Sequence, residues 1–163
     1  MMTVAAEAVD ALRAAGATIA TAESLTGGLV CATLVSVPGA SDVVRGGVVA
    51  YAAEVKIEVL GVDEGLVAER GTVDADVAAA MAAGARDRLG ATYGISTTGV
   101  AGPGPSEGKP AGTVHVAVAG PDGVETRLLH LSGDRDEIRS GTVDALLSWL
   151  VARLGEESRT RRG

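Results

Sequence analysis

The chain has 163 residues, a length typical of one domain with a sizeable core. It is 47% hydrophobic and 21% charged, which is typical of a globular protein and excludes a disordered chain. The formal net charge of −7 disfavours a nucleic-acid-binding surface, and no apolar run is long enough to span a membrane. With 23 glycines and no phenylalanine, the core is expected to combine small aliphatic residues with close backbone approaches.

Cysteine usage and the first residues indicate a reducing compartment. Cys31 is the only cysteine, which excludes an internal disulfide, and its place in an apolar helical run favours core packing. The N-terminus lacks the basic stretch and apolar segment of a secretory signal. We therefore expect a cytoplasmic protein in which residues 1–163 form a single domain and residues 155–163 a loose tail.

Apolar periodicity predicts helices and strands that alternate along the chain. The expected helices begin at Val4, Leu25, Ala52 and Asp74. A last helix, with Arg135 and Arg139 near its start, carries Val143, Leu146, Leu147, Leu150 and Leu154 on one side. The expected strands are Thr18–Ala22, Val43–Tyr51, Thr92–Thr98, Thr113–Ala119 and Val124–Leu131. The last two strands read as a hairpin about Pro121–Gly123, so the pattern predicts a layered α/β fold with a mixed sheet.

Three polar residues coincide with the ends of expected strands. Ser24, Tyr51 and Thr98 each lie at or just past the carboxyl end of one. In open α/β sheets, ligands and catalytic groups gather at that edge. The three side chains are therefore candidates for one site.

Ser24 precedes a glycine pair and an apolar helical run. Backbone amides at such a helix start can hold an anion or a developing oxyanion, which would suit a serine nucleophile. The alternative is that Ser24 only caps the following helix. The G-x-S-x-G pattern of a nucleophile elbow is absent.

Lys56 and Tyr51 are candidates to assist that serine. A lysine base needs its pKa lowered by roughly 2–3 units from about 10.4, which a partly buried cleft can supply. The Tyr51 hydroxyl could donate to the oxyanion or relay a proton. The alternatives are a solvated lysine on a helix and a tyrosine at the rim of the core.

Other chemistry has less support. His115 and His130 have no motif around them, so a histidine-based triad has no sequence support. The D-x-D pairs at 74–76 and 134–136 suit helix starts, and no histidine–carboxylate cluster accompanies them. We therefore expect no metal and no other cofactor.

A glycine- and proline-rich loop, Gly99–Pro105, follows the third expected strand. Its glycines are in the wrong order for a dinucleotide fingerprint, and prolines interrupt them. The loop can still wrap a ligand, because proline stiffens it and glycine permits close approach. Arg135 and Arg139 could pair with a phosphate, or they could be solvated helix charges.

Four motifs occur in a fixed order: Ala22–Gly28 (AESLTGG), Tyr51–Lys56 (YAAEVK), Thr98–Pro103 (TGVAGP) and Gly133–Arg135 (GDR). Together they resemble the C-terminal domain of the CinA family, of the nicotinamide-mononucleotide amidase type, roughly over Val4–Leu154. The resemblance implies a three-layer α/β/α sandwich and commonly a homodimer. It also implies deamidation of nicotinamide mononucleotide to nicotinate mononucleotide and ammonia.

The resemblance implies a role for each matching residue. Ser24 matches the nucleophile, Lys56 the catalytic lysine and Tyr51 the tyrosine beside them. In the expected mechanism, neutral Lys56 takes the Ser24 proton, either directly or through Tyr51, and amides near Thr26 to Gly28 stabilise the oxyanion. The residues expected to bind substrate are Thr26, Gly27, Gly28, Thr98, Gly99, Gly102 and Arg135.

This sequence departs from the family pattern in places. Leu25 replaces a frequent cysteine, and Gly71–Asp74 stands where Gly-Ala-Val-Ser is common, which puts an acid where a serine could contact a phosphate. The N-terminal domain of many members is not in this sequence, so we expect a stand-alone version. The expected partner is a small-molecule nucleotide, with no nucleic acid or membrane.

Two function classes remain as alternatives. A catalytically silent nucleotide-binding or regulatory module, linked to competence or DNA damage, would use the same glycine loop while Ser24 only caps a helix. An interaction scaffold would bind no nucleotide at all. The intact serine, tyrosine and lysine favour the amidase.

Overall fold

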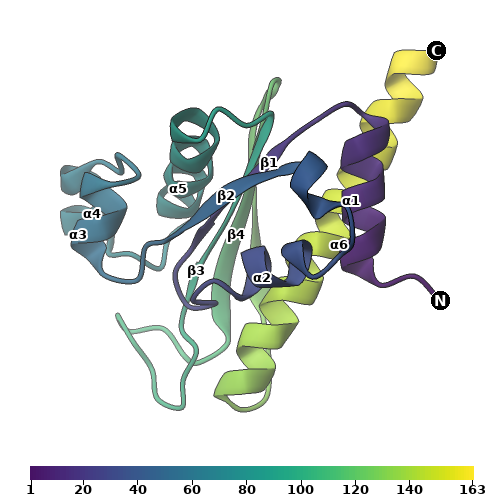
Figure 1. The fold of residues 1–163 in the computed structure, drawn as a ribbon. Helices are drawn as coiled ribbons and strands as arrows, with labels where there is room; N and C mark the ends of the chain where they lie inside the picture. Colours follow the sequence, from purple (N-terminus) through teal and green to yellow (C-terminus); the bar gives the residue numbers. More distant parts are fainter.

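A five-stranded sheet with the strand order β2-β1-β3-β4-β5 forms the middle layer of the molecule (Figure 1). The computed structural model describes residues 1–163. Strands β1, β2 and β3 run parallel, and β4 and β5 form an antiparallel hairpin beside them, so the predicted mixed sheet is confirmed. The strands are β1 Ile19–Glu23, β2 Val44–Val49, β3 Tyr93–Gly99, β4 Thr113–Gly120 and β5 Gly123–His130.

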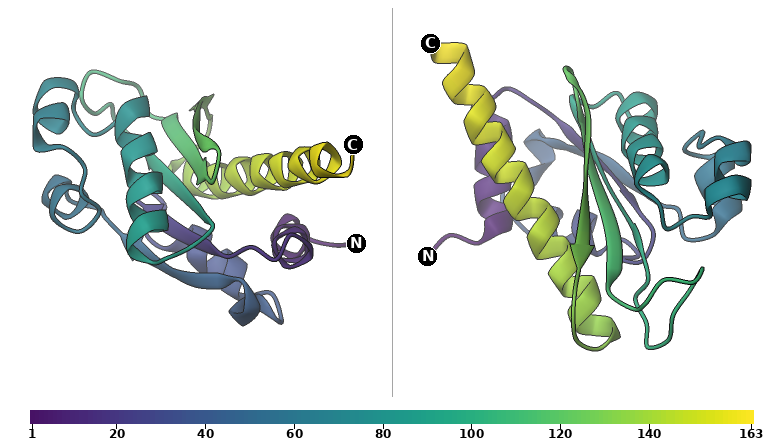
Figure 2. Two further views of the ribbon diagram at one scale, coloured as in Figure 1. Left: turned by 90° about the horizontal axis from the view of Figure 1, so that it is seen from above. Right: turned by 180° about the vertical axis from the view of Figure 1, so that it is seen from behind.

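Helices cover both faces of this sheet, which confirms the three-layer α/β/α sandwich (Figure 2). One face carries α1 Val4–Ala14, α2 Leu29–Val35 and α6 Arg135–Arg162. The other face carries α3 Ala53–Glu58, α4 Glu64–Arg70 and α5 Ala75–Arg88. A short 3₁₀ turn, Ala40–Asp42, precedes β2. None of these helices has the length and apolarity needed to cross a bilayer.

The two faces of the sheet pack differently. Large aliphatic side chains such as Ile19 and Ile95 fill the interface with α1 and α6. Small residues such as Ala117 face α5, which therefore lies close to the strands. A Cβ on Gly94 would collide with the Ala82 carbonyl oxygen of α5. The close backbone approaches expected from the glycine content are thus present.

Local sequence signals set several helix ends. Asp74 caps α5 by accepting hydrogen bonds from the Asp76 and Val77 amides, which explains the acid at this position. The helix expected from Leu25 begins only at Leu29, because residues 24–28 form a turn. Two glycines of that turn have φ of +58° and +101°, which a helix cannot contain.

The helices differ from the sequence-based expectations in two places. Helix α4, which Asp63 caps through the Gly65 amide, was not expected from the sequence. The expected loose tail at 155–163 is instead the end of α6, which continues to Arg162. Hydrogen bonds from the Tyr93 hydroxyl of β3 to Glu157 and from Arg153 to the Val118 carbonyl of β4, at 3.0 Å, hold this part of the helix against the sheet. The Arg153–Glu157 ion pair at 3.1 Å lies within the helix.

Candidate active site

The three polar residues at strand ends lie at one edge of the sheet. Ser24 follows β1 directly, Tyr51 follows β2 by two residues and Thr98 lies at the end of β3. Because these strands run parallel, their carboxyl ends share that edge. The prediction that the three positions share one edge is therefore confirmed.

The structure brings Ser24 and Lys56 into contact. The Nζ of Lys56 lies 2.8 Å from the Oγ of Ser24. The same Nζ donates to the carbonyl oxygens of Ala50 at 2.7 Å and Tyr51 at 3.0 Å. The Lys56 side chain projects from α3 and is 1% exposed, so it is not a solvated helix residue.

Burial makes this lysine a plausible base. Desolvation lowers the pKa of Lys56 to about 8, against a smaller opposing effect of the negative charge of Glu107. In the neutral amine, two N–H groups can donate to the Ala50 and Tyr51 carbonyls. The lone pair then lies toward Ser24, whose hydroxyl can donate to it. The two carbonyls thus orient the amine for accepting the serine proton.

Glu23, not Ser24, accepts the first amides of α2. Its buried carboxylate receives the Val30 amide at 2.7 Å and the Cys31 amide at 3.0 Å. The N-cap position is Gly28, which has no side-chain cap of its own. The capping interpretation of Ser24 was therefore wrong. The Val30 and Cys31 amides are therefore not available to an anion, because a carboxylate of the chain already accepts from them.

The turn after Ser24 has its own hydrogen bonds. The Ser24 amide donates to the Thr97 carbonyl at 3.0 Å, and the Gly27 amide donates to the Ser24 carbonyl at 3.1 Å. The Thr26 hydroxyl is buried against the Thr97 hydroxyl at 2.8 Å. Gly27 therefore cannot offer its amide to an oxyanion without breaking the turn. The Leu25, Thr26 and Gly28 amides have no acceptor within the protein and are the better candidates.

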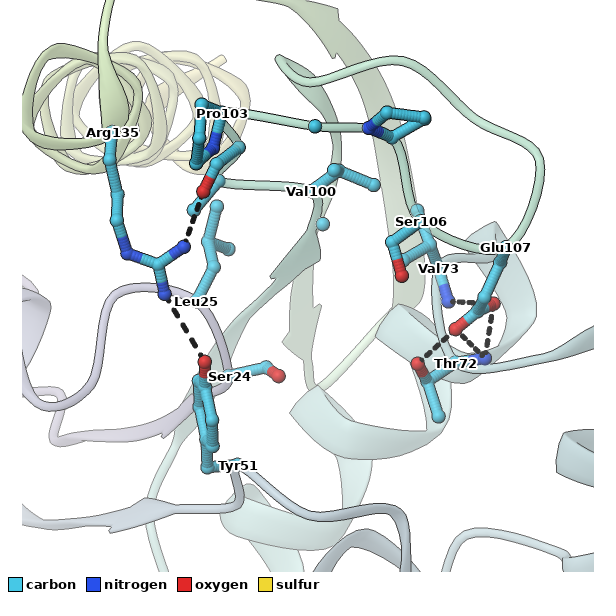
Figure 3. A pocket seen from close by; sticks show the side chains of 15 residues that line it. Ser24, Leu25, Tyr51, Thr72, Val73, Val100, Pro103, Ser106, Glu107 and Arg135 are labelled. Atoms are coloured by element: carbon cyan, nitrogen blue, oxygen red, sulfur yellow. Dashed lines mark hydrogen bonds between the residues drawn. The ribbon is translucent and has the colours of Figure 1, made fainter.

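A pocket of about 360 Å³ opens above Ser24 (Figure 3), large enough for a small ligand. Its walls come from five separate parts of the chain: the Ser24 turn, Tyr51, the segment Thr72–Val73, the loop Gly99–Glu107 and Arg135. Figure 3 shows Arg135 and Glu107 on opposite walls. The pocket thus has a cationic and an anionic side.

Only some of the residues expected to bind substrate line this pocket. Gly99, Gly102 and Arg135 do. Four others do not: Thr26, Gly27, Gly28 and Thr98. The Thr98 hydroxyl, for example, is buried and donates to the Thr72 carbonyl at 2.7 Å.

Arg135 joins two walls of the pocket. One guanidinium nitrogen donates to the Gly102 carbonyl at 2.6 Å, and the other to the Tyr51 hydroxyl at 3.2 Å. The Tyr51 hydroxyl is therefore bonded to Arg135 and makes no hydrogen bond to Ser24 or Lys56. Arg139 instead donates to the carbonyls of the Ser24 turn, at 3.0 Å to Leu25 and 3.2 Å to Thr26.

Sequence reasoning missed Glu107 and Glu23. Glu107 accepts hydrogen bonds from the Thr72 hydroxyl at 2.6 Å and from the Thr72 and Val73 amides at 2.9 and 3.2 Å. Burial would raise its pKa, but these bonds and the charge of Lys109 together hold the pKa of Glu107 below its ordinary value. Glu23 lies within the Ala22–Gly28 motif, but nothing local shows that its carboxylate accepts the amides of α2 across the turn. No motif includes Glu107, because its partners Thr72 and Val73 are 35 and 34 positions away.

The remaining candidates lie outside the pocket. His115 is half-buried on β4, where burial lowers its pKa and its Nδ1 has no hydrogen-bond partner. Asp134 caps α6 in a capping box with Glu137, which explains the second D-x-D pair. Cys31 is a free, half-buried thiol on α2. No three His, Cys, Asp or Glu side chains are placed to hold a metal ion.

Comparison with known proteins places this geometry in a family. A family model described as the CinA C-terminal domain matches residues 1–154. A CinA-like protein from Frankia casuarinae is 59% identical over 138 residues, which are 85% of this chain and 32% of that protein. Another from Mycolicibacterium paratuberculosis is 52% identical over 131 residues, covering 77% of this chain and 30% of that protein. The chain thus spans about a third of the length of these curated relatives.

Solved structures from the same family also superpose on this chain. The crystal structure of a CinA superfamily protein from Klebsiella pneumoniae superposes with a TM-score of 0.92 at 30% identity, covering 94% of this chain and 96% of that one. A competence/damage inducible protein from Agrobacterium tumefaciens gives a TM-score of 0.88 at 36% identity, covering 93% of each chain. The chain belongs to the CinA family, through the C-terminal domain of that family.

Proposed function

We propose that this domain is an amidohydrolase that uses Ser24 as nucleophile and Lys56 as base. One observation carries the proposal: a serine hydroxyl at a strand end lies 2.8 Å from a buried lysine amine whose pKa is lowered to about 8. A nucleophile beside a base of shifted pKa, at the floor of a pocket, is the arrangement that acyl transfer requires.

Nicotinamide mononucleotide is the substrate we propose, with nicotinate mononucleotide and ammonia as products. The ordered motifs around Ser24, Lys56 and Arg135 support this choice through their resemblance to the amidase type of the family. Arg135 supports it physically, because an exposed guanidinium at the pocket wall can pair with a phosphate. The names of the relatives refer only to CinA and to competence or damage.

In the first half-reaction, Ser24 transfers its proton to neutral Lys56 as Oγ bonds to the carboxamide carbon. The negative charge that develops on the carbonyl oxygen can be met by the free Leu25 and Thr26 amides. The carbon–nitrogen bond then breaks, and the Lys56 ammonium returns its proton to the leaving nitrogen. Ammonia departs, and an ester on Ser24 remains.

The second half-reaction repeats the first with water in place of the serine hydroxyl. Lys56 takes a proton from water as the water oxygen bonds to the ester carbon. The bond to Ser24 Oγ breaks, and Lys56 returns the proton to that oxygen. The acid product leaves, and both residues regain their starting protonation states.

The test is ammonia release from nicotinamide mononucleotide. We expect turnover by the unaltered protein and a loss of at least about 10³-fold in Ser24→Ala, because the nucleophile is gone. Ser140→Ala, at an exposed position of α6, is the matched control and should retain full activity. Equal ammonia release by Ser24→Ala would exclude Ser24 as nucleophile. Tight nucleotide binding without ammonia release would favour the silent binding module.

A further inference from the structure

Glu107 holds the longest loop of the pocket wall. The loop of residues 100–112 connects β3 to β4, and part of it lines the pocket above Ser24 (Figure 3). Both carboxylate oxygens of Glu107 accept from the Thr72 amide, at 2.9 and 3.1 Å. The Thr72 hydroxyl and the Val73 amide add two more bonds at 2.6 and 3.2 Å. One side chain thus fastens this loop to the segment that leads into α5.

The backbone around Glu107 is shaped for this contact. Glu107 has a φ of +51°, an uncommon conformation for a residue with a side chain. On the opposite side, a Cβ at Gly71 would collide with the Glu107 carboxylate, so glycine leaves the space that the carboxylate fills. Lys109 of the same loop also donates to the Val73 carbonyl. Loop 100–112 and the segment Gly71–Val73 therefore contact each other at several points.

Glu107 and Ser24 line the same pocket, and Lys56 contacts Ser24 at 2.8 Å, so the Glu107 carboxylate is a charged group on the wall of the Ser24–Lys56 site. Its carboxylate is the one charged group that raises the pKa of Lys56, against the larger lowering by burial. The other charged group on the pocket wall is Arg135, while Lys109 and Asp74 lie at the 71–74 segment. Lys56 becomes an ammonium when it accepts the serine proton, and a nearby negative charge favours that state.

We propose that Glu107 is a positioning residue of the Ser24–Lys56 site: it fixes the pocket wall formed by loop 100–112 and supplies a negative charge that favours protonated Lys56. This inference rests on the proposed function, in which Lys56 cycles between amine and ammonium. The Arg135 wall and the Glu107 wall of the pocket then have different roles. Arg135 is available to an anionic group of the substrate, whereas Glu107 serves the chain's own lysine.

The chain offers a direct readout, because Lys56 and Lys109 are its only lysines. In protein labelled with ¹³C-lysine, the two ε-carbon signals can be titrated separately by NMR and assigned with Lys109→Arg. We expect Glu107→Gln to move the Lys56 midpoint to lower pH than in the unaltered protein. Glu54→Gln, an exposed acid on α3 with no resolved effect on Lys56, is the matched control and should leave the midpoint in place.

Kinetics separate the charge from the fastening of the loop. Thr72→Val removes one bond to Glu107 but keeps its carboxylate, so KM should rise while the Lys56 midpoint stays. Glu107→Gln should raise KM by about tenfold and also shift the pH profile of kcat to lower pH, since the profile follows Lys56. A purely structural residue would change KM without moving that profile.

An unmoved Lys56 midpoint in Glu107→Gln would overturn the proposal, whatever happens to KM. A lower midpoint together with a higher KM would support it. Failure of the proposed function is a different result: the unaltered protein would release no ammonia from nicotinamide mononucleotide. The NMR titration needs no turnover, so it still measures the effect of Glu107 on Lys56 in that case.

Discussion

Lys56 is buried without a carboxylate in contact with its amine. Its three acceptors are the Ser24 hydroxyl and two backbone carbonyls, which satisfy hydrogen bonds but supply no full negative charge. Burial lowers the pKa of Lys56 from 10.5 to about 8, equivalent to about 3 kcal/mol of preference against the charged form. Roughly one molecule in ten then carries a neutral Lys56 at pH 7, enough for a working base.

Tyr51 provides a test of which residue accepts the serine proton. Its hydroxyl is bonded to Arg135 at 3.2 Å, and its only contact with Lys56 is through the backbone carbonyl. Tyr51→Phe keeps that carbonyl. We therefore expect KM to rise about three- to tenfold, through a less fixed Arg135, with kcat nearly unchanged.

Steady-state kinetics of Tyr51→Phe check this expectation, and Tyr93→Phe, away from the pocket, is the control for the loss of a tyrosine hydroxyl. A fall in kcat of more than about 100-fold in Tyr51→Phe would instead show that the hydroxyl relays the proton.

The positions of helices α2 and α5 each depend on one residue of the sheet. Helix α2 has only seven residues, and the Glu23 carboxylate at its start fixes both the helix and the turn that carries Ser24. Helix α5 approaches the sheet at Gly94, where its backbone takes the space of a side chain. The positions of the nucleophile turn and of the Thr72–Val73 wall thus depend on a buried acid and on a glycine.

Gly94→Ala tests how closely α5 packs. The added methyl group would collide with the Ala82 carbonyl, so helix and strand must separate, and we expect the free energy of unfolding to fall by about 3 kcal/mol. Gly155→Ala is the matched control, because it lies in α6 with open space around it and should raise that free energy by about 1 kcal/mol. Urea unfolding of both variants measures this, and equal stability of Gly94→Ala and the unaltered protein would refute the close packing.

The molecule as a whole assembles its site from segments far apart in sequence. Strand periodicity and the strand-end rule were enough to predict the sheet edge that carries Ser24, Tyr51 and Thr98. The contact of Lys56 with Ser24 joins residues 32 positions apart, and no local pattern encodes its distance. The same holds for Glu107, whose partner Thr72 is 35 positions away.

Errors in the sequence-based picture have a common physical origin. The Ser24 turn was read as the first turn of a helix, because an apolar run follows it and glycines can occur in helices. Only the three-dimensional structure shows that the Glu23 carboxylate occupies the amides of α2. The tail was read as loose because charged residues fill it, although the contact of Glu157 with Tyr93 and Arg153 holds it as helix.

The most direct test of this account is the titration of Lys56 itself in the unaltered protein, followed through its ¹³C ε-carbon signal. Burial beside Ser24 predicts a midpoint at about pH 8, and a rate of ammonia release that rises with pH through the same midpoint as the amine loses its proton. A Lys56 midpoint near the ordinary value of about 10.4 would contradict the account, because the amine would then be charged at neutral pH and unable to take the serine proton.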